Sequence, residues 1–424
     1  MSLDRLLALA ATLEPPFVLL EDGRASGTTH LAWGARRRLR RHWDDLVPLP
    51  IGLPAGRWYG TIAYEQGLPG TLRPAIPTVA QPLCDLFEPA NRIVLRPGAG
   101  APLCEGPEAE DRWRAALSMT PGSIVVPVFP DTTARGRPWR SFDADGFATA
   151  VERAREYIVA GDIYQVNLSV AERWPLVGRP WDAYRRLRAL NPSPWMGYAD
   201  FGDWQLVCGS PELLVELSRA AGNGGPEEPG GRLRTRPIAG TRKKTGDAER
   251  DARMRAELRL DAKERAEHVM LLDLARNDTG RVARYGSVLV AEREVVEEYS
   301  HVFHLVSEVR GALRPELEAA DVIASYFPGG TITGCPKIRA MEIIHEVEPV
   351  ARGAYTGALG WIEPDALQLN IVIRSAVVSG EEVAIQAGAG IVADSIPQRE
   401  WRESLRKAAA VRAAFGADDG DAER

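Results

Sequence analysis

The sequence of 424 residues predicts an α+β fold. Residues 1–95 contain short apolar runs separated by Pro and Gly, as in Pro48–Gly56, and this pattern is typical of strands joined by turns. From Asp143 onward, strands and helices are mixed without the strict alternation of βαβ units. This arrangement favours an α+β fold over a doubly wound parallel sheet.

Composition divides the chain into an N-terminal β-rich region, residues 1–120, a main region, residues 140–416, and a flexible tail, residues 417–424. Two Gly- and Pro-rich passages, Pro97–Pro107 and Pro121–Pro138, are the best candidates for a boundary or a long surface connection. The length allows two or three average domains, although one large β-rich unit is also possible. We find no internal repeat.

Periodicity and capping signals predict the individual elements. Apolar residues recur at helical spacing from Phe147 to Ile158, so we expect a helix that Asp143 caps and Gly161 ends. Residues 247–276 are predicted to be one long charged helix. The remaining predictions are helices at 316–326 and 398–415, strands at 205–208, 213–217, 295–309, 354–362, 370–378 and 382–387, and a polar loop at 222–231.

Charge and cysteine content exclude several classes of protein. The net charge is −6, and the basic run Arg36–Arg41 is interpreted as a solvated face rather than a nucleic-acid-binding patch. Four dispersed cysteines without a C-x-x-C pair argue against a zinc site or a disulfide framework, which is consistent with a reducing cytoplasm. No apolar run approaches the roughly 18 residues of a membrane span, so we expect a cytoplasmic protein without a membrane partner.

Two pairs of glutamates are the most informative chemical feature. Glu264 and Glu267 lie three residues apart in one predicted helix, and Glu400 and Glu403 do so in another, so each pair shares a helical face. Four converging carboxylates would need a cation. Mg²⁺ suits them because it is commonly held by protein carboxylates and completed by water and an anionic substrate. The alternative is two solvated helix faces, where this spacing is common.

Two glycine-rich segments resemble nucleotide-binding motifs but lack required parts. Residues 388–393 match the dinucleotide pattern G-x-G-x-x-A, yet Pro397 intervenes before the next helix, so the glycines more naturally let backbone N–H groups approach a small anion. Residues 329–337 have the opening spacing of a P-loop, but Cys335 and Pro336 replace its Lys-Ser/Thr. This turn either binds an anion at the N-terminus of the following helix or has a purely structural role.

Four further features are candidates for a site. The rigid turn at 236–242 carries hydroxyl and guanidinium donors, and Arg374, in a predicted apolar strand, is either a clamp for a carboxylate or an edge ion pair. His304 also lies in a predicted apolar strand, where it is either a core residue or a functional one. Glu212 follows a strand, and burial there would raise its pKa and make it a general acid.

Four long motifs in this order resemble the chorismate-utilising enzymes, a family that includes component I of anthranilate synthase and of aminodeoxychorismate synthase. The resemblance is strong from about Asp143 to the C-terminus and weak over the first 95 residues. It implies two packed antiparallel β-sheets flanked by helices, with a chorismate-binding site between them. The motifs are RPIAGT at 236–241, DAKERAEHVMLLDLARND at 261–278, FPGGTITGCPKIRAMEIIHEV at 327–347 and QAGAGIVADSIPQREWRESLRK at 386–407.

The resemblance also implies roles for individual residues. Glu267 and Glu403 would hold Mg²⁺, Glu264 and Glu400 would complete the acidic shell, and the ion would clamp the ring carboxylate of chorismate. Glu212 corresponds to the general acid that assists departure of the C4 hydroxyl. The other matching positions are His304 and Thr331 in the active site and Gly240, Thr241, Tyr355, Arg374, Gly388, Gly390 and Lys407 in contact with substrate.

The branch of the family depends on a few positions. Gln165 stands where the water-adding members have a lysine base, so ammonia is the expected nucleophile. Ala239 matches anthranilate synthases, whereas many aminodeoxychorismate synthases carry a nucleophilic lysine there. The turn at 329–334 and Asp22, which replaces a serine of feedback-regulated anthranilate synthases, favour the other branch. We therefore predict formation of 4-amino-4-deoxychorismate for folate biosynthesis, with anthranilate formation as the alternative.

The ammonia source is expected to be a second protein. We find no glutaminase Cys-His-Glu constellation in the sequence, so a glutamine amidotransferase subunit is the predicted partner, and no nucleic acid is expected. A non-catalytic relative that binds chorismate-like ligands is a remote alternative, and a nicotinamide-dependent dehydrogenase is another.

Overall fold

The computed structural model describes residues 2–23, 27–43, 52–70, 72, 78–118, 132–134, 136–218, 231–299 and 301–417. In these residues, every pair of neighbouring strands is antiparallel, and the strands form two layers that share β4 (Cys84–Leu95), which pairs with β2 on one side and β3 on the other. One layer contains β3 (Trp58–Ile62), β17 (Ala358–Glu363), β18 (Ala366–Ile371), β11 (Leu213–Ser218), β12 (Arg232–Thr235), β15 (Val302–Ala312), β13 (Ile238–Lys243) and β14 (Leu289–Glu298).

The second layer continues from β2 through β1 to β8, and its order is not the order of the sequence because β19 and β20 insert between β10 and β8. Its strands are β2 (Thr29–Arg41), β1 (Phe17–Asp22), β9 (Trp195–Asp200), β10 (Trp204–Ser210), β19 (Ser375–Ser379), β20 (Glu382–Ile391) and β8 (Gln165–Val177), with the short strands β5 (Leu103–Glu105) on β4 and β6 (Thr133–Ala134), β7 (Trp139–Arg140) and β16 (Gly334–Cys335) on β8.

A shared apolar core holds the two layers together. Tyr59 and Leu359 of the first layer pack in one buried cluster with Val18, Leu206 and Val377 of the second. Burial of side chains of this size stabilises a fold by about 1.5–3 kcal/mol each. The predicted α+β class with two packed antiparallel sheets is therefore confirmed, with the refinement that the layers are continuous through β4.

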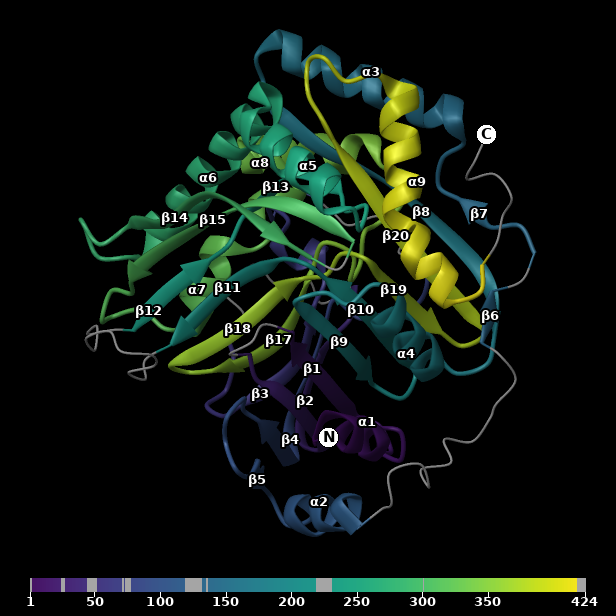
Figure 1. The fold of residues 1–424 in the computed structure, drawn as a ribbon, viewed down its shortest axis with the longest axis vertical. Helices are drawn as coiled ribbons and strands as arrows, with labels where there is room; N and C mark the ends of the chain where they lie inside the picture. The colour runs from purple at the N-terminus through teal and green to yellow at the C-terminus, as the bar shows by residue number, and fades with distance from the viewer. Residues whose placement is uncertain are drawn as a thin grey trace.

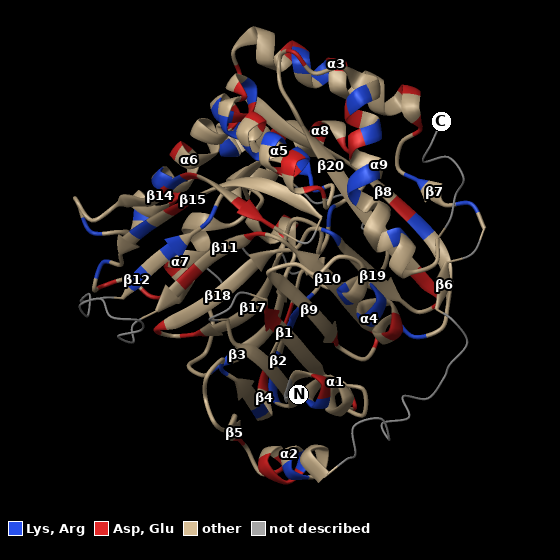
Figure 2. Ribbon diagram, in the orientation of Figure 1, with Lys and Arg blue, Asp and Glu red and all other residues tan. Residues whose placement is uncertain are grey.

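Helices cover the outer faces of the sheets (Figure 1). The α6 helix packs on β13 and β15, whereas α4 and α9 pack on β10 and β20. Basic and acidic residues alternate along the outer helices in Figure 2. The helices are α1 (Ser2–Ala10), α2 (Ala109–Ser118), α3 (Ala144–Ala160), α4 (Pro180–Leu190), α5 (Ala248–Leu260), α6 (Ala262–Val282), α7 (Ala319–Tyr326), α8 (Lys337–Val347) and α9 (Pro397–Ala414).

The predicted helix after Asp143 is confirmed in its caps as well as its extent. The Asp143 carboxylate accepts a hydrogen bond from the Gly146 N–H at 2.8 Å, and Gly161 ends α3 with a φ of 82°. A left-handed residue at this position favours glycine, which has no Cβ to clash. Sequence reasoning works here because both ends of the helix are decided locally.

The predicted helix at 247–276 is wrong, because two helices meet at Asp261. The Asp261 carboxylate accepts hydrogen bonds from the backbone N–H groups of Lys263 and Glu264, at 3.0 and 3.1 Å, and caps α6. An aspartate that caps a new helix redirects the chain instead of continuing the old helix. The predicted strand at 295–309 is likewise a hairpin, made by the ends of β14 and β15.

The predicted strand at 370–378 is also interrupted. Strand β18 ends at Ile371 and β19 begins at Ser375, and Arg374 between them has a φ of 52°. A left-handed backbone cannot continue a strand. The predicted strand at 354–362 begins only at Ala358, after a turn in which Thr356 has a φ of 59°.

The N-terminal strands belong to the same sheets as the rest of the chain. Passage 97–107, predicted as a boundary or a surface connection, contains β5, which pairs with β4. Much of passage 121–138, most of loop 222–231 and all but the first residue of the predicted tail lie outside the described residues.

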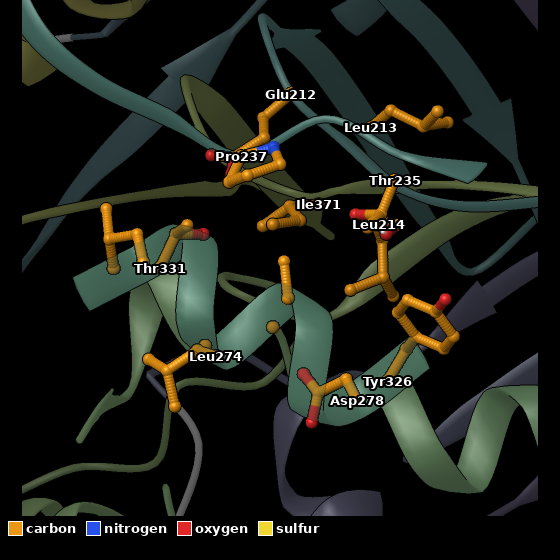
Figure 3. Close-up of a pocket in the computed structure, with 14 residues that line it drawn as sticks. Glu212, Leu213, Leu214, Thr235, Pro237, Leu274, Asp278, Tyr326, Thr331 and Ile371 are labelled. Carbon is orange, nitrogen blue, oxygen red and sulfur yellow. Dashed lines mark hydrogen bonds between the residues drawn. The ribbon is translucent and has the colours of Figure 1, made fainter. Parts of the chain in front are cut away.

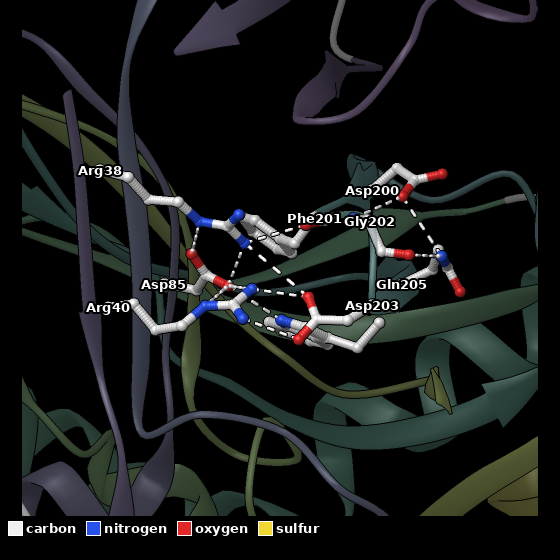
Figure 4. A network of polar contacts seen from close by, with 9 residues as sticks. Arg38, Arg40, Asp85, Asp200, Phe201, Gly202, Asp203 and Gln205 are labelled. Carbon is white, nitrogen blue, oxygen red and sulfur yellow. Dashed lines mark hydrogen bonds and ion pairs between the residues drawn. The ribbon is translucent and has the colours of Figure 1, made fainter. Parts of the chain in front are cut away.

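Two arginines of the basic run Arg36–Arg41 also have a structural role, which refines its interpretation as a solvated face (Figure 4). Arg38 and Arg40 donate to the fully buried carboxylate of Asp85 at 2.8 and 2.7 Å, and Arg40 also donates to Asp203 at 2.7 Å. These bonds tie β2 and β4 to the turn between β9 and β10.

The described cysteines, Cys84, Cys104, Cys208 and Cys335, form no disulfide. Within the described ranges, none of the helices is both long and apolar enough to cross a membrane.

Candidate active site

Helices α6 and α9 bring the two glutamate pairs to one region. Glu264 and Glu267 lie in the first two turns of α6, and Glu400 and Glu403 lie in the first two turns of α9. Burial raises the pKa of Glu267, and the nearby negative charges of Glu264 and Glu403 add to that effect, while a hydrogen bond from Gln165 opposes it. Burial likewise raises the pKa of Glu400, with a further contribution from Glu403.

Three of these carboxylates bind protein donors, and in the described part of the chain no three His, Cys, Asp or Glu side chains form a metal-binding group. The four donors are all carboxylate oxygens, the ligand type that a hard divalent cation takes, and burial, with the charges of Glu264 and Glu403 adding to it, raises the pKa of Glu267. The bound pairs are Glu264 with Arg242 (2.8 Å), Glu267 with Gln165 (3.0 Å) and Glu403 with Lys407 (2.8 Å).

Two cationic side chains lie beside this acidic set. The Lys407 ammonium donates to the Gly388 carbonyl at 3.0 Å. Among the described residues, the Arg374 guanidinium makes a single hydrogen bond, of 3.4 Å, to the Lys407 carbonyl. A guanidinium has five N–H donors, and burial lowers the pKa of Arg374. Its left-handed backbone is the kind of strained conformation that often marks a functional site. An anion would satisfy these donors.

Tyr355 lies next to Arg374, although the two are separated by β17 and β18 in the sequence. The Tyr355 side chain is 6% exposed, and burial raises its pKa to about 12, opposed by the positive charges of Arg352 and Arg374. The hydroxyl therefore stays protonated and can donate a hydrogen bond at neutral pH.

His304 of β15 joins the site to β13. A bulge between Ala239 and Thr241 turns Gly240 to a φ of 69°, and a Cβ there would lie 3.0 Å from a carboxylate oxygen of Glu264. The His304 Nδ1 atom lies 3.1 Å from both the Gly240 carbonyl oxygen and the Thr241 hydroxyl. Since a carbonyl can only accept, Nδ1 carries the proton and Nε2 is free to accept. Burial lowers the pKa of His304 to about 4, so the ring is neutral.

Gly388 and Gly390 lie inside strand β20, not at a strand-to-helix turn, so they do not form a dinucleotide-binding loop. A Cβ on Gly388 would lie 2.8 Å from the Asn167 amide oxygen, and one on Gly390 would lie 2.4 Å from the Gln165 amide nitrogen. The glycines thus leave room for the side chains of β8, one of which reaches Glu267. Ala239 instead packs against Leu271 and Leu274 in a small apolar cluster.

Glu212 lies in the turn between β10 and β11, in a pocket that Thr331 alone of the other predicted site residues also lines. The side chain is 5% exposed, and burial raises its pKa to about 8, although the neighbouring Thr331 hydroxyl and Ile238 N–H oppose the shift. Glu212 and Thr331 both line the pocket in Figure 3. At neutral pH this carboxyl group holds a proton that it can give away.

One residue that the sequence did not single out lies near both His304 and Glu212. The Tyr299 ring lies 5.1 Å from the His304 ring, and burial raises the Tyr299 pKa, with smaller contributions from charges that include Glu212. Tyr299 stands in the tip of the hairpin that was predicted as one strand, so the wrong prediction of that element hid it.

A carboxyl group with a raised pKa, cationic donors and a set of carboxylates are the kinds of group that an enzyme uses on a small anionic substrate. Residues 22–413 match the chorismate binding enzyme family, and the chain belongs to that family.

Relatives in both branches are similar to this chain. It is 50% identical to aminodeoxychorismate synthase component 1 of Bacillus subtilis over 309 residues, which are 73% of this chain and 62% of that protein. It is 43% identical to anthranilate synthase component 1 of Thermus thermophilus over 382 residues, which are 88% of this chain and 79% of that protein. Some curated relatives are matched over little more than half their length, as with the 53% of an Aquifex aeolicus anthranilate synthase component 1.

The fold agrees with a solved structure of the family. The crystal structure of anthranilate synthase component I from Streptococcus pneumoniae superimposes with a TM-score of 0.75 and 30% identity, covering 92% of each chain.

Proposed function

We propose that this protein aminates chorismate to 4-amino-4-deoxychorismate in the folate branch, with Mg²⁺ and with ammonia supplied by a separate glutamine amidotransferase subunit. In this reaction the C4–O bond of chorismate breaks, a C4–N bond forms, and the hydroxyl leaves as water after it takes a proton. The observation that carries the amination of chorismate, in either branch, is the buried carboxyl of Glu212, whose pKa is raised to about 8. A group that holds a proton at neutral pH can supply it to the departing hydroxyl.

We assign substrate binding to the two cationic side chains beside the glutamates and to their neighbours. Arg374 and Lys407 would bind carboxylate oxygens of chorismate, and the Tyr355 hydroxyl would donate to the same anion. His304 accepts through Nε2, because Nδ1 is bound to the Gly240 carbonyl, and can orient a substrate hydroxyl. These groups would fix the ring so that its C4 hydroxyl faces Glu212.

Glu267 and Glu403 would hold Mg²⁺, with Glu264 and Glu400 completing the acidic set, and the ion would serve as template and Lewis acid for the ring carboxylate. The partners that these carboxylates have in the structure, Arg242, Gln165 and Lys407, would have to release or share them.

A matched pair of variants tests the metal assignment. Glu267→Gln should abolish turnover and weaken Mg²⁺ binding measured by calorimetry while the melting temperature stays close to that of the wild type. Glu257→Gln, in α5, serves as the control and should leave both unchanged. Near-normal turnover by Glu267→Gln would show that Glu267 is not a ligand of Mg²⁺.

The second candidate is anthranilate formation, favoured by Ala239 and by the similarity to the Thermus anthranilate synthase component 1. Ala239 is 7% exposed and has no nucleophile, so a covalent route through an enzyme amine is closed at this position. Both reactions expel the C4 hydroxyl, so Glu212 supports either. The 50% identity to the Bacillus aminodeoxychorismate synthase component 1 favours the first.

Product analysis separates the two. Purified protein is incubated with chorismate, Mg²⁺ and excess ammonium salt, without a partner. A product that added lyase converts to p-aminobenzoate supports the proposal. Fluorescent anthranilate together with pyruvate would overturn it in favour of the tryptophan branch, and chorismate binding without turnover would favour a non-catalytic relative.

A further inference from the structure

A buried arginine outside the proposed site touches three segments that carry its residues. Arg352 lies between α8 and β17, is 3% exposed, and has a guanidinium whose carbon lies 5.9 Å from the centre of the Tyr355 ring. No pattern in the sequence singles it out.

The Arg352 guanidinium binds the backbone on two sides of the site. Its Nη1 atom donates to the Ile332 carbonyl at 2.8 Å, and Ile332 directly follows Thr331. Its Nη2 atom donates to the Asn167 carbonyl at 2.6 Å, and Asn167 pairs with Gly390 across β8 and β20. One planar group therefore fixes the distance between the turn beside Glu212 and the strand beside the glycines.

A glutamate fixes the orientation of that group. Glu348, four residues earlier, accepts from Nε and Nη2 of Arg352 at 2.9 and 2.7 Å. The same carboxylate accepts from the N–H and hydroxyl of Ser169, both at 2.8 Å, so it also binds β8.

A second buried carboxyl holds the backbone of the arginine itself. Glu65 is 3% exposed and accepts from the N–H groups of Arg352 and Gly353 at 2.6 and 3.0 Å. These bonds set the path of the chain that leads two residues later to Tyr355. The arginine is thus held at its backbone and at its guanidinium.

We infer that Arg352 is a positioning residue for the chorismate site, which acts through Thr331, Asn167 and Tyr355 without touching substrate. This inference rests on the function proposed above. A buried ion pair contributes little net stability, because desolvation of the two charges offsets their attraction, so a buried pair can instead serve to specify a unique geometry. Small displacements of positioned groups are costly to catalysis.

The test compares two buried arginines in the full-length protein. Arg352→Lys keeps the charge but cannot reproduce the planar fork of donors, whereas Arg412→Lys makes the same change at a 4% exposed arginine of α9 that pairs with buried Glu172 at 3.5 Å. We expect Arg352→Lys to lower kcat/KM for chorismate about tenfold or more. Arg412→Lys should change it by less than about twofold.

Folding and positioning are separated by measuring kcat and KM well below the melting temperature of each variant. A merely structural role would lower the melting temperature and leave both constants unchanged in the folded protein. Equal kcat/KM values for the two folded variants would therefore overturn the inference. If Arg352→Lys does not fold, Glu348→Gln with Glu172→Gln as its control provides the same comparison.

The result is distinguishable from failure of the proposed function. Turnover by the wild type and by Arg412→Lys reports on the function, whereas the ratio between the two variants reports on Arg352. If neither protein turns over chorismate, the same ratio is taken from dissociation constants for chorismate, measured by calorimetry with Mg²⁺ present. Equal constants overturn the inference, and a weaker Arg352→Lys supports it.

Discussion

Two buried carboxyl groups, Asp85 and Glu212, have opposite surroundings. Asp85 has no exposed surface and accepts from the guanidinium groups of Arg38 and Arg40 and from the indole N–H of Trp204. Glu212 is almost as buried, but the groups that oppose the shift of its pKa are a hydroxyl and a backbone N–H, neither of them charged, and its pKa rises to about 8. A buried carboxyl group needs a polar partner. A positively charged partner favours the ionised carboxylate, whereas neutral partners leave the carboxyl group protonated.

The largest effect should follow from removing the protonated acid. Glu212→Gln keeps the shape of the side chain but cannot donate a proton, so we expect kcat to fall about 1000-fold, with no loss of melting temperature. Chorismate consumption and thermal melts measure both. Glu216→Gln, on the adjoining strand, is the control and should retain activity. The comparison fails if Glu212→Gln stays within about tenfold of the wild type.

Removing the charge of Asp85 should lower the stability of the protein and leave its activity unchanged. Asp85→Asn leaves two guanidinium groups without their anion, and we expect the free energy of unfolding to fall by about 3 kcal/mol with kcat of the folded protein unchanged. Urea titration supplies the free energy. Asp203→Asn, at a 61% exposed side chain of the same network, should cost less than about 1 kcal/mol. Equal losses would show that burial does not distinguish the two carboxylates.

The pH dependence sharpens the difference. The pKa of Glu212 is raised in the folded state from 4.5 to about 8, so its contribution to folding stability is fully present below pH 4.5 and is lost as the pH rises through 8. Relative to Glu212→Gln, the unfolding free energy of the wild type should fall by about 1.4 kcal/mol per pH unit in this window. In the same experiments kcat/KM of the wild type should decline above pH 8, because the acid loses its proton. A flat profile to pH 10 would contradict the role of Glu212.

The smallest effect tests the geometry of the arginine pairs. Arg40 donates to Asp85 and Asp203 at once, which a lysine cannot do with the same fork. Arg40→Lys should therefore cost about 1 kcal/mol of unfolding free energy. Arg36→Lys, in the same run, should cost less, and the idea of a shared fork is wrong if the two losses are equal.

Local signals predicted much of the fold. The caps of α3 and the glutamate pairs on α6 and α9 were predicted, because each depends on residues close in sequence. The breaks at Asp261 and Arg374 were missed, since a side-chain cap and a left-handed backbone leave the hydrophobic pattern unchanged.

The amino-acid sequence by itself determined the class of fold, the four motifs that mark the family and the identity of the groups that can act in chemistry. Only the tertiary structure decided which of them meet and in what state. Glu212 becomes a protonated acid because residues distant in sequence exclude water from it, and Arg352 gains its place because the segments it binds converge only in the folded chain. Burial and long-range hydrogen bonding are properties of the packed chain, so no local pattern encodes them.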